Sequence, residues 1–414
     1  MKILHITFSK LGGAGIGVKR LQESLMQRKI KNEMFFFDEF LNSKFKISNK
    51  IIWYLHIFLK KVLIKFFSSL KKKNSISLNI FNNFNLSKLI KNKCPDIVHL
   101  HWIGNEMISI KQISQINKPL VWTMHDMWPV LGCEHYTSNN RFIHGFNSHN
   151  RPDYEKGLDL DKLIWDRKYK YLKKKKIYII CPSSWIKNKV TKSFIFRSKD
   201  KFLCPYLIDQ NQWKILSKKK LFIFKEPPKK KTVIFFSATS SVNYRKGFNY
   251  LFEAINKYLK KENYFLLVAG VKPKLFDDLL IEKKFIGNVR SQKHLNKIYC
   301  SSDILVVPSI LETFGQVFAE AGACGIPSVT FNHTGASDVI DHKTTGYLAK
   351  YKSSKDLVNG IKWCEKKIRT NKNFSNTIRK KIIKKFSYKK NSSRMIKIYK
   401  KILKDNQHLK DKNL

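Results

Sequence analysis

The chain has 414 residues, and 43% of them are hydrophobic. This length predicts two or three domains that can each bury a core, and the composition excludes a disordered protein. Seven cysteines without a Cys-x-x-Cys pair exclude a disulfide scaffold and argue against structural zinc. Lys and Arg number 81 against 30 Asp and Glu, and the net charge of +51 favours a polyanionic partner, either nucleic acid or an anionic membrane surface.

The N-terminus shows no targeting signal. Met1 is followed by a short apolar run and then by glycines, without a cleavable apolar region. The nearest candidate for a membrane-spanning helix, Ile51–Leu70, carries Lys60, Lys61 and Lys65, so it does not read as one. We therefore expect a cytoplasmic protein, and the basic composition fits a peripheral position on the inner face of the plasma membrane.

Apolar runs alternate with helical stretches through the first half, which is the pattern of βαβ units and of a parallel sheet covered by helices. The expected strands are Lys2–Phe8, Met34–Phe37, Asp96–Trp102, Leu120–Met124 and Ile177–Cys181. The expected helices include Val18–Met26, Leu86–Lys91 and Lys162–Lys173.

Within this half, Ile51–Leu70 has the pattern of an amphipathic helix. At about 100° per residue, one face holds Lys50, Lys61, Lys65, Ser68 and Lys72, and the rest holds Trp53, Leu55, Phe58, Leu59, Val62, Phe66 and Leu70. No Asp or Glu occurs between Glu39 and Asp96. Such a helix resembles those that lie in a membrane interface, where each Lys near an anionic leaflet contributes about 1 kcal/mol. The alternative is an ordinary helix packed on its own domain.

The pattern restarts after Pro227–Lys231, a segment typical of a linker. The second series has expected strands at Thr232–Phe236, Tyr264–Ala269, Ile304–Val307, Pro327–Thr330 and Gly346–Leu348, and a helix at Phe248–Lys260. The sequence therefore predicts an α/β protein with two Rossmann-like domains, over residues 1–205 and 206–385. Open parallel sheets bind ligands at the carboxyl ends of their strands, so two such sheets predict a site in a central cleft.

The most informative stretch covers residues 301–348. A helix is expected from Gly315 to Gly325, and a Gly at its start would let a ligand approach bare N–H groups that suit a diphosphate. Glu312, in the loop ahead, and Glu320, eight residues later in the helix, can each accept hydrogen bonds from hydroxyl groups. Taken alone, the pair also fits one dipole-stabilised acid and one solvated helix acid.

This stretch resembles the retaining glycosyltransferases of family 4, which have the GT-B fold. The resemblance rests on Phe285–Val289, Leu295–Ser302, Asp303–Ser309, the Glu312…Glu320 pair, Gly325–Val329, Thr334–Ile340 and Thr345–Leu348. It implies a donor site formed by Thr313, Phe314, Gly315, Gln316, Val317 and Glu320, with Glu320 on the ribose and Glu312 as a catalytic residue that positions the sugar. It also implies that residues 386–414 form a helix crossing back to the N-terminal domain, with a basic tail.

Phosphate contacts are expected from both halves. Gly12-Gly13-Ala14-Gly15 follows the first strand, where the family has a Gly-rich loop facing the donor phosphates, so Gly12 and Gly13 are expected to bind the donor. A tight turn is the alternative. Positive charge is expected from Arg245 and Lys246. The family has an earlier Arg where this chain has Ser237-Ala238, so either Arg245 replaces it or the diphosphate relies on Lys246 and the helix after Glu312.

The segment Val121–Asp126 matches a family strand that ends in His-Asp. The resemblance places His125 beside the donor sugar, in contact with a hydroxyl group, as the second catalytic residue. Residues 128–136 continue as in relatives that act on surface polysaccharides, and the polar and aromatic loop 133–155 fits acceptor binding.

Two patterns raise the question of a metal. His99 and His101 share one face of a strand, but no third ligand is evident nearby, so packing is the favoured interpretation. Asp159-Leu160-Asp161 fits the Asp-x-Asp string of another glycosyltransferase class, but Asp161 precedes a helical run and is expected as its N-cap. The sequence therefore predicts neither a metal nor a cofactor.

Together these features predict a metal-independent, retaining glycosyltransferase that takes a sugar from a UDP- or GDP-linked donor. The expected acceptor is a hydroxyl of a lipid-linked glycan or oligosaccharide in surface polysaccharide synthesis (lipopolysaccharide, O-antigen or capsule). No protein nucleophile is evident, so a front-face route is expected from the resemblance. The alternatives are a sugar-nucleotide epimerase on the same fold, an inactive relative, and a basic nucleic-acid-binding protein. Nucleic acid is not expected, because no RNA-binding aromatic cluster or helix-turn-helix signature is present.

Overall fold

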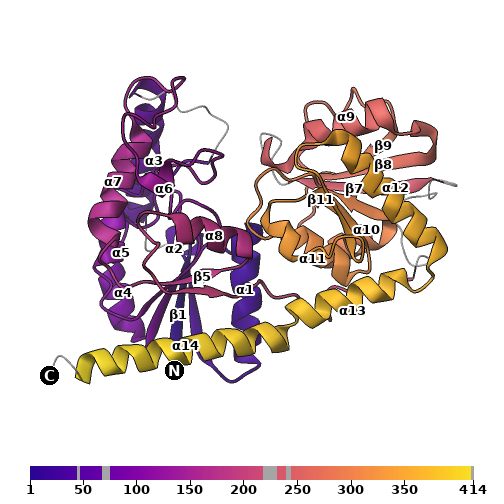
Figure 1. Ribbon diagram of the computed structural model, residues 1–414. Coiled ribbons are helices and arrows are strands. Elements are labelled where there is room, and N and C mark those ends of the chain that lie inside the picture. Colours follow the sequence, from indigo (N-terminus) through magenta and orange to yellow (C-terminus); the bar gives the residue numbers. More distant parts are fainter. Residues whose placement is uncertain (44–46, 68–74, 218–230, 239–243, 412–414) are drawn as a thin grey trace. The chain divides into compact units, whose positions relative to one another are not determined.

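The computed structural model describes residues 1–43, 47–67, 75–217, 231–238 and 244–411. It divides into two compact units, Met1–Pro205 with Asn391–Leu414, and Tyr206–Lys390 (Figure 1). Each unit is built on a parallel sheet of six strands with helices around it, so the expected pair of Rossmann-like folds is confirmed. The expected linker, residues 227–231, lies outside the described residues except for Lys231.

The first unit has the strand order β2-β1-β3-β4-β5-β6. Its strands are β1 (Lys2–Thr7), β2 (Lys31–Phe36), β3 (Ile97–Leu100), β4 (Leu120–Thr123), β5 (Tyr178–Cys181) and β6 (Lys201–Leu203). Its helices are α1 (Gly12–Met26), α2 (Phe37–Asn42), α3 (Ile47–Phe67), α4 (Leu86–Lys93), α5 (Ile110–Ser114), α6 (Arg141–His144), α7 (Leu160–Leu172), α8 (Ser184–Lys192) and most of α14 (Tyr388–Asp411). Strands β3, β4 and β5 are buried along their whole length, as expected when helices cover both faces of a parallel sheet.

Helix α14 packs on the sheet of the first unit although it comes last in the chain. The hydroxyl of Tyr399 lies 2.6 Å from Nδ1 of His99 in β3, and Nδ2 of Asn406 donates to the hydroxyl of Tyr178 in β5 at 3.0 Å. Met395 and Ile402, four residues before and three residues after Tyr399, lie on the same face of the helix and are buried. Figure 1 shows this yellow helix running along the unit beside β1.

The second unit has the strand order β12-β11-β10-β7-β8-β9. Its strands are β7 (Thr232–Ala238), β8 (Tyr264–Gly270), β9 (Glu282–Phe285), β10 (Ile304–Val306), β11 (Ser328–Phe331) and β12 (Gly346–Ala349). Its helices and 3-10 turns are η3 (Tyr244–Lys246), α9 (Phe248–Tyr258), η4 (Lys261–Asn263), α10 (Gln292–Ser301), α11 (Gln316–Ala323), η5 (Gly335–Asp338), α12 (Ser354–Thr370) and α13 (Phe374–Phe386).

The direction of the strand order reverses beside the first strand of each unit. In the first unit, β1 lies between β2 and β3, and in the second, β7 lies between β10 and β8. Ligands of open α/β sheets bind beyond the carboxyl ends of the strands at such a reversal. The loops that follow β1 and β3, and those that follow β7 and β10, are therefore the places to look for a site.

The observed elements differ from the expected ones at two kinds of position. The glycines at 12–15 form the first turn of α1 rather than a loop. A Cβ at Gly15 would lie 2.4 Å from the carbonyl oxygen of Ser9, so this turn packs against the chain that leads into it. The short edge strands β6 and β9 were not expected, because β6 has only three residues and β9 is largely polar, so neither carries an apolar run of strand length. None of the helices within the described residues has the length and apolar character needed to cross a bilayer.

Candidate functional site

The two loops at the reversal point of the second unit lie in contact. The turn η3 follows β7, and the second loop follows β10. The backbone N–H of Ile310 donates to the carbonyl of Arg245 at 2.7 Å. Gly247 has a φ of +70°, and a Cβ there would lie 1.9 Å from the carbonyl oxygen of Pro308. A glycine is therefore needed for these loops to approach each other, and the approach brings Lys246 beside Glu312.

Lys246 and Glu312 form a nearly buried ion pair. Nζ of Lys246 lies 2.6 Å from Oε2 of Glu312, with 16% and 12% of the two side chains exposed. Burial alone would raise the pKa of Glu312, but attraction and hydrogen bonding from Lys246, with a smaller effect of Arg245, hold it below its usual value. Arg245 itself donates from Nη1 to the carbonyl of Leu311 at 3.3 Å. The structure thus brings together three residues that the sequence analysis assigned to donor binding and catalysis.

Helix α11 begins directly after this loop. Its N-cap, Gly315, has a φ of +88°, and a Cβ there would lie 2.4 Å from the ring of Phe318. Glycine is therefore required both by the backbone conformation and by the packing. The first-turn N–H groups of Gln316 and Val317 have the geometry and the dipole that favour an anion. The helix ends at Ala323, two residues before the expected end.

Thr313 and Phe314 are buried, with exposures of 2% and 1%, and the Phe314 ring packs edge-on against Phe386 at 5.4 Å. Phe314 is therefore a core residue, and only its backbone could meet a donor. The expectation that Phe314 belongs to the donor site can therefore apply only to its backbone.

Glu320 lies deeper in α11 and is 6% exposed. Its Oε2 accepts a hydrogen bond from the hydroxyl of Tyr299 in α10 at 3.2 Å. The ring of Tyr299 is itself buried against Phe235 of β7. A solvated helix acid, the alternative left open by the sequence, does not fit this burial. Glu320 is a buried carboxylate held in place by Tyr299 on the α10 side.

The corresponding position in the first unit is the N-terminus of α1. Gly12 has a φ of +73°, and nothing lies within 4 Å of the position that a Cβ would take. Gly12 and Gly13 are the first two residues of the helix, so an anion here would meet a helix N-terminus rather than a Gly-rich loop. This changes the expected form of the contact while leaving both residues at the carboxyl end of β1.

Four histidines lie together at the carboxyl ends of β1, β3 and β4. Nε2 of His101 lies 3.0 Å from Nδ1 of His5, and Nδ1 of His101 lies 3.0 Å from Nε2 of His125. Burial lowers the pKa of His5 to about 3 and that of His125 to about 4, and it lowers those of His99 and His101 well below the usual value. All four imidazoles are therefore neutral near pH 7, and His125 is the end of a hydrogen-bonded chain.

The sequence analysis missed His5, and its expectation that His99 and His101 have no third nitrogen ligand nearby is wrong. The parallel register pairs His5 with His99, so a strand pairing would have revealed it. Nitrogens of His5, His99 and His101 lie within 4.8 Å of one another. However, His99 uses its two nitrogens on Tyr399 and Thr123, and His101 uses both of its own on other histidines. No carboxylate belongs to this cluster in the described residues, so a buried dication here would stay uncompensated.

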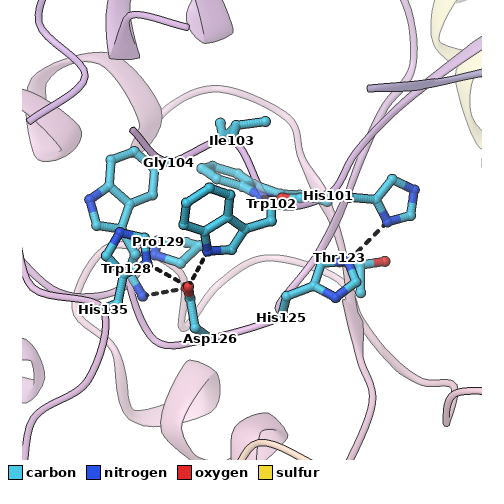
Figure 2. A pocket seen from close by; sticks show the side chains of 11 residues that line it. His101, Trp102, Ile103, Gly104, Thr123, His125, Asp126, Trp128, Pro129 and His135 are labelled. Carbon is cyan, nitrogen blue, oxygen red and sulfur yellow. Dashed lines mark hydrogen bonds and ion pairs between the residues drawn. The ribbon is translucent and has the colours of Figure 1, made fainter. Parts of the chain in front are cut away.

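Asp126, next to His125, anchors the floor of a small pocket (Figure 2). It accepts hydrogen bonds from Nε1 of Trp102 at 2.7 Å, the N–H of Trp128 at 3.0 Å and Nδ1 of His135 at 2.5 Å. Burial would raise the pKa of Asp126, but these partners, His135 first, hold it below its usual value. The backbone turn that carries His125 is thus held in place by the Asp126 carboxylate, which accepts hydrogen bonds from three donors.

Nε2 of His135 lies 2.7 Å from the hydroxyl of Ser77, which completes a Ser–His–Asp arrangement with Asp126. Ser77 is fully buried, and its oxygen also accepts the N–H of Asn105 at 2.9 Å. A Cβ at Gly104 would lie 2.8 Å from the same oxygen, so the space above it is filled. The three side chains are ordered as in a nucleophilic triad. However, the Ser77 hydroxyl is buried, so a substrate could not reach it. We therefore assign the arrangement a structural role in holding the loops that carry Ser77, Asp126 and His135.

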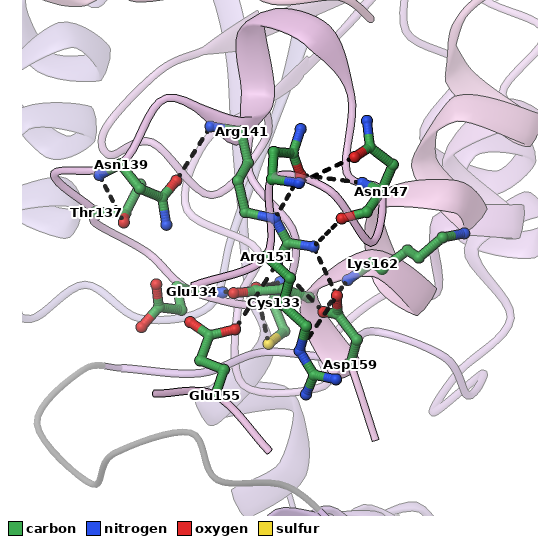
Figure 3. Close-up of polar contacts among 12 residues, drawn as sticks. Cys133, Glu134, Thr137, Asn139, Arg141, Asn147, Arg151, Glu155, Asp159 and Lys162 are labelled. Carbon is green, nitrogen blue, oxygen red and sulfur yellow. Dashed lines mark hydrogen bonds and ion pairs between the residues drawn. The ribbon is translucent and has the colours of Figure 1, made fainter. Parts of the chain in front are cut away.

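The loop 133–162 is organised by Arg141 (Figure 3). Its guanidinium donates to Asp159 at 2.6 Å and to Asn150 at 3.0 Å, and it lies 3.7 Å from Glu155. Asp159, not Asp161, is the N-cap of α7 and accepts the N–H of Lys162 at 2.9 Å. The expectation that Asp161 is the N-cap is therefore wrong, because the first Asp of the Asp-x-Asp string takes that position.

Asp161 binds a different part of the loop from Asp159. Its Oδ1 accepts the N–H of Cys133 at 2.7 Å and that of Glu134 at 3.3 Å. The two carboxylates of Asp159-Leu160-Asp161 are thus used by different parts of the loop. They form a support for backbone and Arg141, and they do not converge as metal ligands would.

Two family models match the chain one after the other. The model described as Glycosyltransferase Family 4 matches residues 11–204, and the model described as Glycosyl transferases group 1 matches residues 217–381. A curated relative, the uncharacterized glycosyltransferase MJ1607 of Methanocaldococcus jannaschii, is 29% identical over 167 residues, which are 38% of this chain and 43% of the relative. The matched segment thus spans less than half the length of that relative.

Solved structures match along almost the whole chain. A sucrose-phosphate synthase of Thermosynechococcus elongatus has a TM-score of 0.69 at 14% identity, covering 98% of this chain and 100% of that one. HepE of Anabaena, solved with UDP and glucose, has a TM-score of 0.59 at 16% identity over 97% and 100%. WaaG, a glycosyltransferase involved in lipopolysaccharide biosynthesis, has a TM-score of 0.59 at 12% identity over 95% and 98%. These similarities establish the GT-B fold.

Proposed function

We propose that this chain, which belongs to the glycosyltransferases of the GT-B fold, moves a sugar from a nucleotide-diphosphate sugar to a hydroxyl group of an acceptor. The observation that carries the proposal is the layout at the reversal point of the second unit. There Lys246, from the turn after β7, pairs with Glu312 in the loop after β10, and the glycine-capped N-terminus of α11 and the buried Glu320 follow Glu312 along the chain. This order supplies contacts for a diphosphate, a sugar and a ribose in turn.

The diphosphate would replace part of the contact between Lys246 and Glu312. The ammonium of Lys246 and the N–H groups at the start of α11 can stabilise the negative charge that grows on the leaving phosphate oxygen. Such groups are fixed before the reaction, because Gly247 and Gly315 set the conformations of their loops. The carboxylate of Glu312, released from part of its ion pair, can accept hydrogen bonds from the donor sugar.

The proposed reaction proceeds with retention of configuration and without a protein nucleophile. The bond between the anomeric carbon and the diphosphate oxygen breaks, and a new bond forms from the acceptor oxygen to the same carbon. The acceptor proton passes to the leaving diphosphate oxygen, so the products are a nucleoside diphosphate and the glycosylated acceptor. His125, neutral because burial lowers its pKa to about 4, would donate a hydrogen bond to a sugar hydroxyl rather than act as a cation.

We propose further that the acceptor is a lipid-linked glycan or oligosaccharide used for a surface polysaccharide. This finer assignment is supported by the similarity of residues 128–136 to enzymes of that kind and by the fold shared with WaaG. The loop 133–155, which Arg141 organises, is the proposed contact for the acceptor. The net charge of +51 supports work at the anionic inner face of a membrane.

The donor is proposed to bind without a divalent metal. The two carboxylates of Asp159-Leu160-Asp161 are used by Arg141 and by the backbone of residues 133–134, and Lys246 supplies the positive charge instead. UDP is the first nucleotide to test, because HepE was solved with UDP and glucose.

The test is a thermal-shift titration with UDP, GDP, ADP and a short RNA, each with and without EDTA. We expect one nucleoside diphosphate to raise Tm in a saturable way by an amount that EDTA does not change. Stabilisation by RNA alone would instead favour the nucleic-acid-binding alternative. Turnover of the donor sugar to an epimer, without an acceptor, would favour the epimerase.

A further inference from the structure

Helix α3 packs on the first unit through one face, which carries apolar and polar side chains: Trp53, Leu63 and Ile64 lie against the hydrophobic core. Nε1 of Trp53 donates to the carbonyl of Asn105 at 2.8 Å, and Nδ1 of His56 lies 2.7 Å from Oδ1 of Asn83. Lys60 is buried and lies 3.6 Å from the carboxylate of Glu106. This inward face thus buries Lys60 and places Trp53 and His56 in hydrogen bonds with other segments of the unit.

The opposite face of α3 is apolar and exposed. Six of its large apolar or aromatic side chains are between 53% and 68% exposed: Ile47, Ile51, Tyr54, Leu55, Phe58 and Phe66. Their spacing of three or four residues puts the first five on one stripe along the helix. A helix on the surface of a water-soluble protein normally turns its apolar side chains toward the core, because burying each one contributes about 1.5–3 kcal/mol to the free energy of folding.

Lysines border the exposed stripe. Lys61 and Lys65 are exposed, and at about 100° per residue they fall beside Tyr54 and Phe58. This differs from the expected separation into a lysine face and an apolar face. The chain carries no Asp or Glu between Glu39 and Asp96, so no acidic residue of this segment offsets the charge of Lys61 and Lys65.

We propose that the exposed face of α3 is a membrane-docking surface, with the apolar stripe inserted among the acyl chains of an anionic leaflet and Lys61 and Lys65 at the level of its phosphates. Apolar side chains with flanking lysines match an interface in which an apolar layer lies directly below negative charge. The docking deepens the proposed function, because a lipid-linked acceptor would be presented at this surface. Membrane docking can be tested without measuring sugar transfer.

A second copy of the chain is the less suitable occupant. Two copies that met through this face would bring the lysines of both helices together, and no acidic residue of the segment could pair with them. The net charge of +51 on each copy opposes the same contact. An anionic lipid surface satisfies both the apolar stripe and its lysines.

The experiment is flotation of the full-length protein with vesicles of phosphatidylcholine alone or mixed with phosphatidylglycerol, at low and high salt. We expect binding to the anionic vesicles that falls as salt rises. The variant Ile51→Ser/Leu55→Ser/Phe58→Ser should lower the partition coefficient by roughly tenfold or more. Lys61→Glu/Lys65→Glu should lower it in the same direction and abolish most of the salt dependence.

Two controls carry changes of the same chemical kind elsewhere. Leu280→Ser removes an apolar side chain that is 62% exposed in the second unit, and Lys366→Glu/Lys380→Glu makes the same charge change on α12 and α13. Both controls should bind vesicles as the wild type does. All variants should keep the Tm of the wild type and its Tm shift with the nucleotide that the wild type binds, which separates docking from donor binding.

Several results would overturn the proposal. One is that wild-type protein fails to float with anionic vesicles at low salt. Another is that the serine variant binds as well as the wild type, or that the control variants lose as much binding. A wild-type dimer that the serine variant converts to a monomer, with no vesicle binding by either, would assign the face to a second copy. Absence of a nucleotide shift in every variant, with docking intact, would count against the proposed function alone.

Discussion

Nδ1 of His101 lies 3.0 Å from Nε2 of His125, and Nε2 of His101 makes a second hydrogen-bond contact of this kind with His5. Because each neutral imidazole carries one proton, the chain His5–His101–His125 has two arrangements. In one, Nε2 of His5 is an N–H, and in the other it is a bare nitrogen. That atom is buried and has no hydrogen-bond partner. Orphaned buried N–H groups are the rarer kind, so we expect His5 to donate through Nδ1 and His125 to carry its proton on Nδ1.

Replacing His101 should therefore change the tautomer of His125, although His101 is not itself expected to contact the sugar donor. We expect His101→Leu to lower kcat about tenfold and to leave His125 as a mixture of tautomers in imidazole nitrogen NMR. His101→Asn keeps an N–H donor near the position of Nδ1 and should restore most of the rate and the single tautomer. His99→Gln, which replaces a histidine that does not bond to His125, is the control. Unchanged tautomers in His101→Leu would refute the role of the chain.

The buried histidines also predict how stability depends on pH. Their pKa values in the folded chain lie below the usual 6.5, with that of His5 at about 3 and that of His125 at about 4. Below pH 6.5 the unfolded chain binds protons that the folded chain does not, so stability falls as the pH drops. The loss between pH 7.5 and 5.5 should be about 1.4 kcal/mol for each such histidine. Urea unfolding at these two pH values measures it, and His99→Gln should reduce the loss by one histidine's share.

The Lys246–Glu312 pair should matter more than an exposed ion pair does. Lys246→Met leaves a nearly buried carboxylate unpaired and should cost about 3 kcal/mol at pH 7. The pKa of Glu312 is held below its usual value, so its contribution is present above pH 4.5 and is lost as the pH falls through the lowered pKa. The difference between variant and wild type should therefore shrink at pH 4.

The matching control is Lys257→Met, which breaks the exposed pair with Glu253 in α9 and should cost under about 0.5 kcal/mol. Adding Glu312→Gln to Lys246→Met should recover most of the lost stability, because no charge is then left unpaired. If urea unfolding at pH 7 shows equal losses for the two lysine variants, the buried pair contributes no more than a surface one.

Glu320 is predicted to bind the ribose of the donor nucleotide. Glu320→Gln keeps the shape of the side chain but removes its charge, and we expect the Kd of the bound nucleoside diphosphate to rise about tenfold. Tyr299→Phe removes the hydroxyl that donates to Glu320 at 3.2 Å and leaves the carboxylate in place, so it should have a smaller effect. Calorimetric titration measures both. An unchanged Kd in Glu320→Gln would show that the ribose binds elsewhere.

Gly315 should tolerate no side chain. Gly315→Ala meets both a φ of +88° and the ring of Phe318 at 2.4 Å. Gly287 has a φ of +69°, but nothing lies within 4 Å of the position of its Cβ. Gly287→Ala therefore measures only the cost of placing alanine at a positive φ, about 1 kcal/mol of stability. We expect Gly315→Ala to lose at least about 2 kcal/mol more and to weaken nucleotide binding, because the start of α11 must shift. Equal unfolding midpoints for the two variants would contradict this reading of the packing.

Local sequence patterns predicted most of the fold. The buried strands β4, β5 and β10 are short apolar runs, and the apolar run alone indicates a strand buried on both faces of a sheet. The edge strands β6 and β9 were missed because an edge strand needs no such run. The N-terminus of α11 was also predictable, since Gly315 and the change from strand to helical spacing lie within ten residues of sequence.

The candidate site was only partly readable from the sequence. Lys246 and Glu312 could be named from the order of motifs along the chain, but their ion pair depends on a contact between the loops after β7 and β10. His5 could not be connected with His101 and His125, because β1 and β3 are adjacent in the sheet and far apart in the sequence. Asp159 and Asp161 are equally good N-caps on paper, and the start of α7 decides between them.

The sequence by itself determined where the chain forms strands and helices, because backbone preference and apolar spacing act over a few residues. It did not determine which side of an element faces inward. Helix α3 shows the difference most clearly: its hydrophobic pattern predicts an amphipathic helix, but the partners of Trp53, His56 and Lys60 are provided by distant segments. Burial depends on what covers a surface, and only the tertiary structure supplies the covering groups.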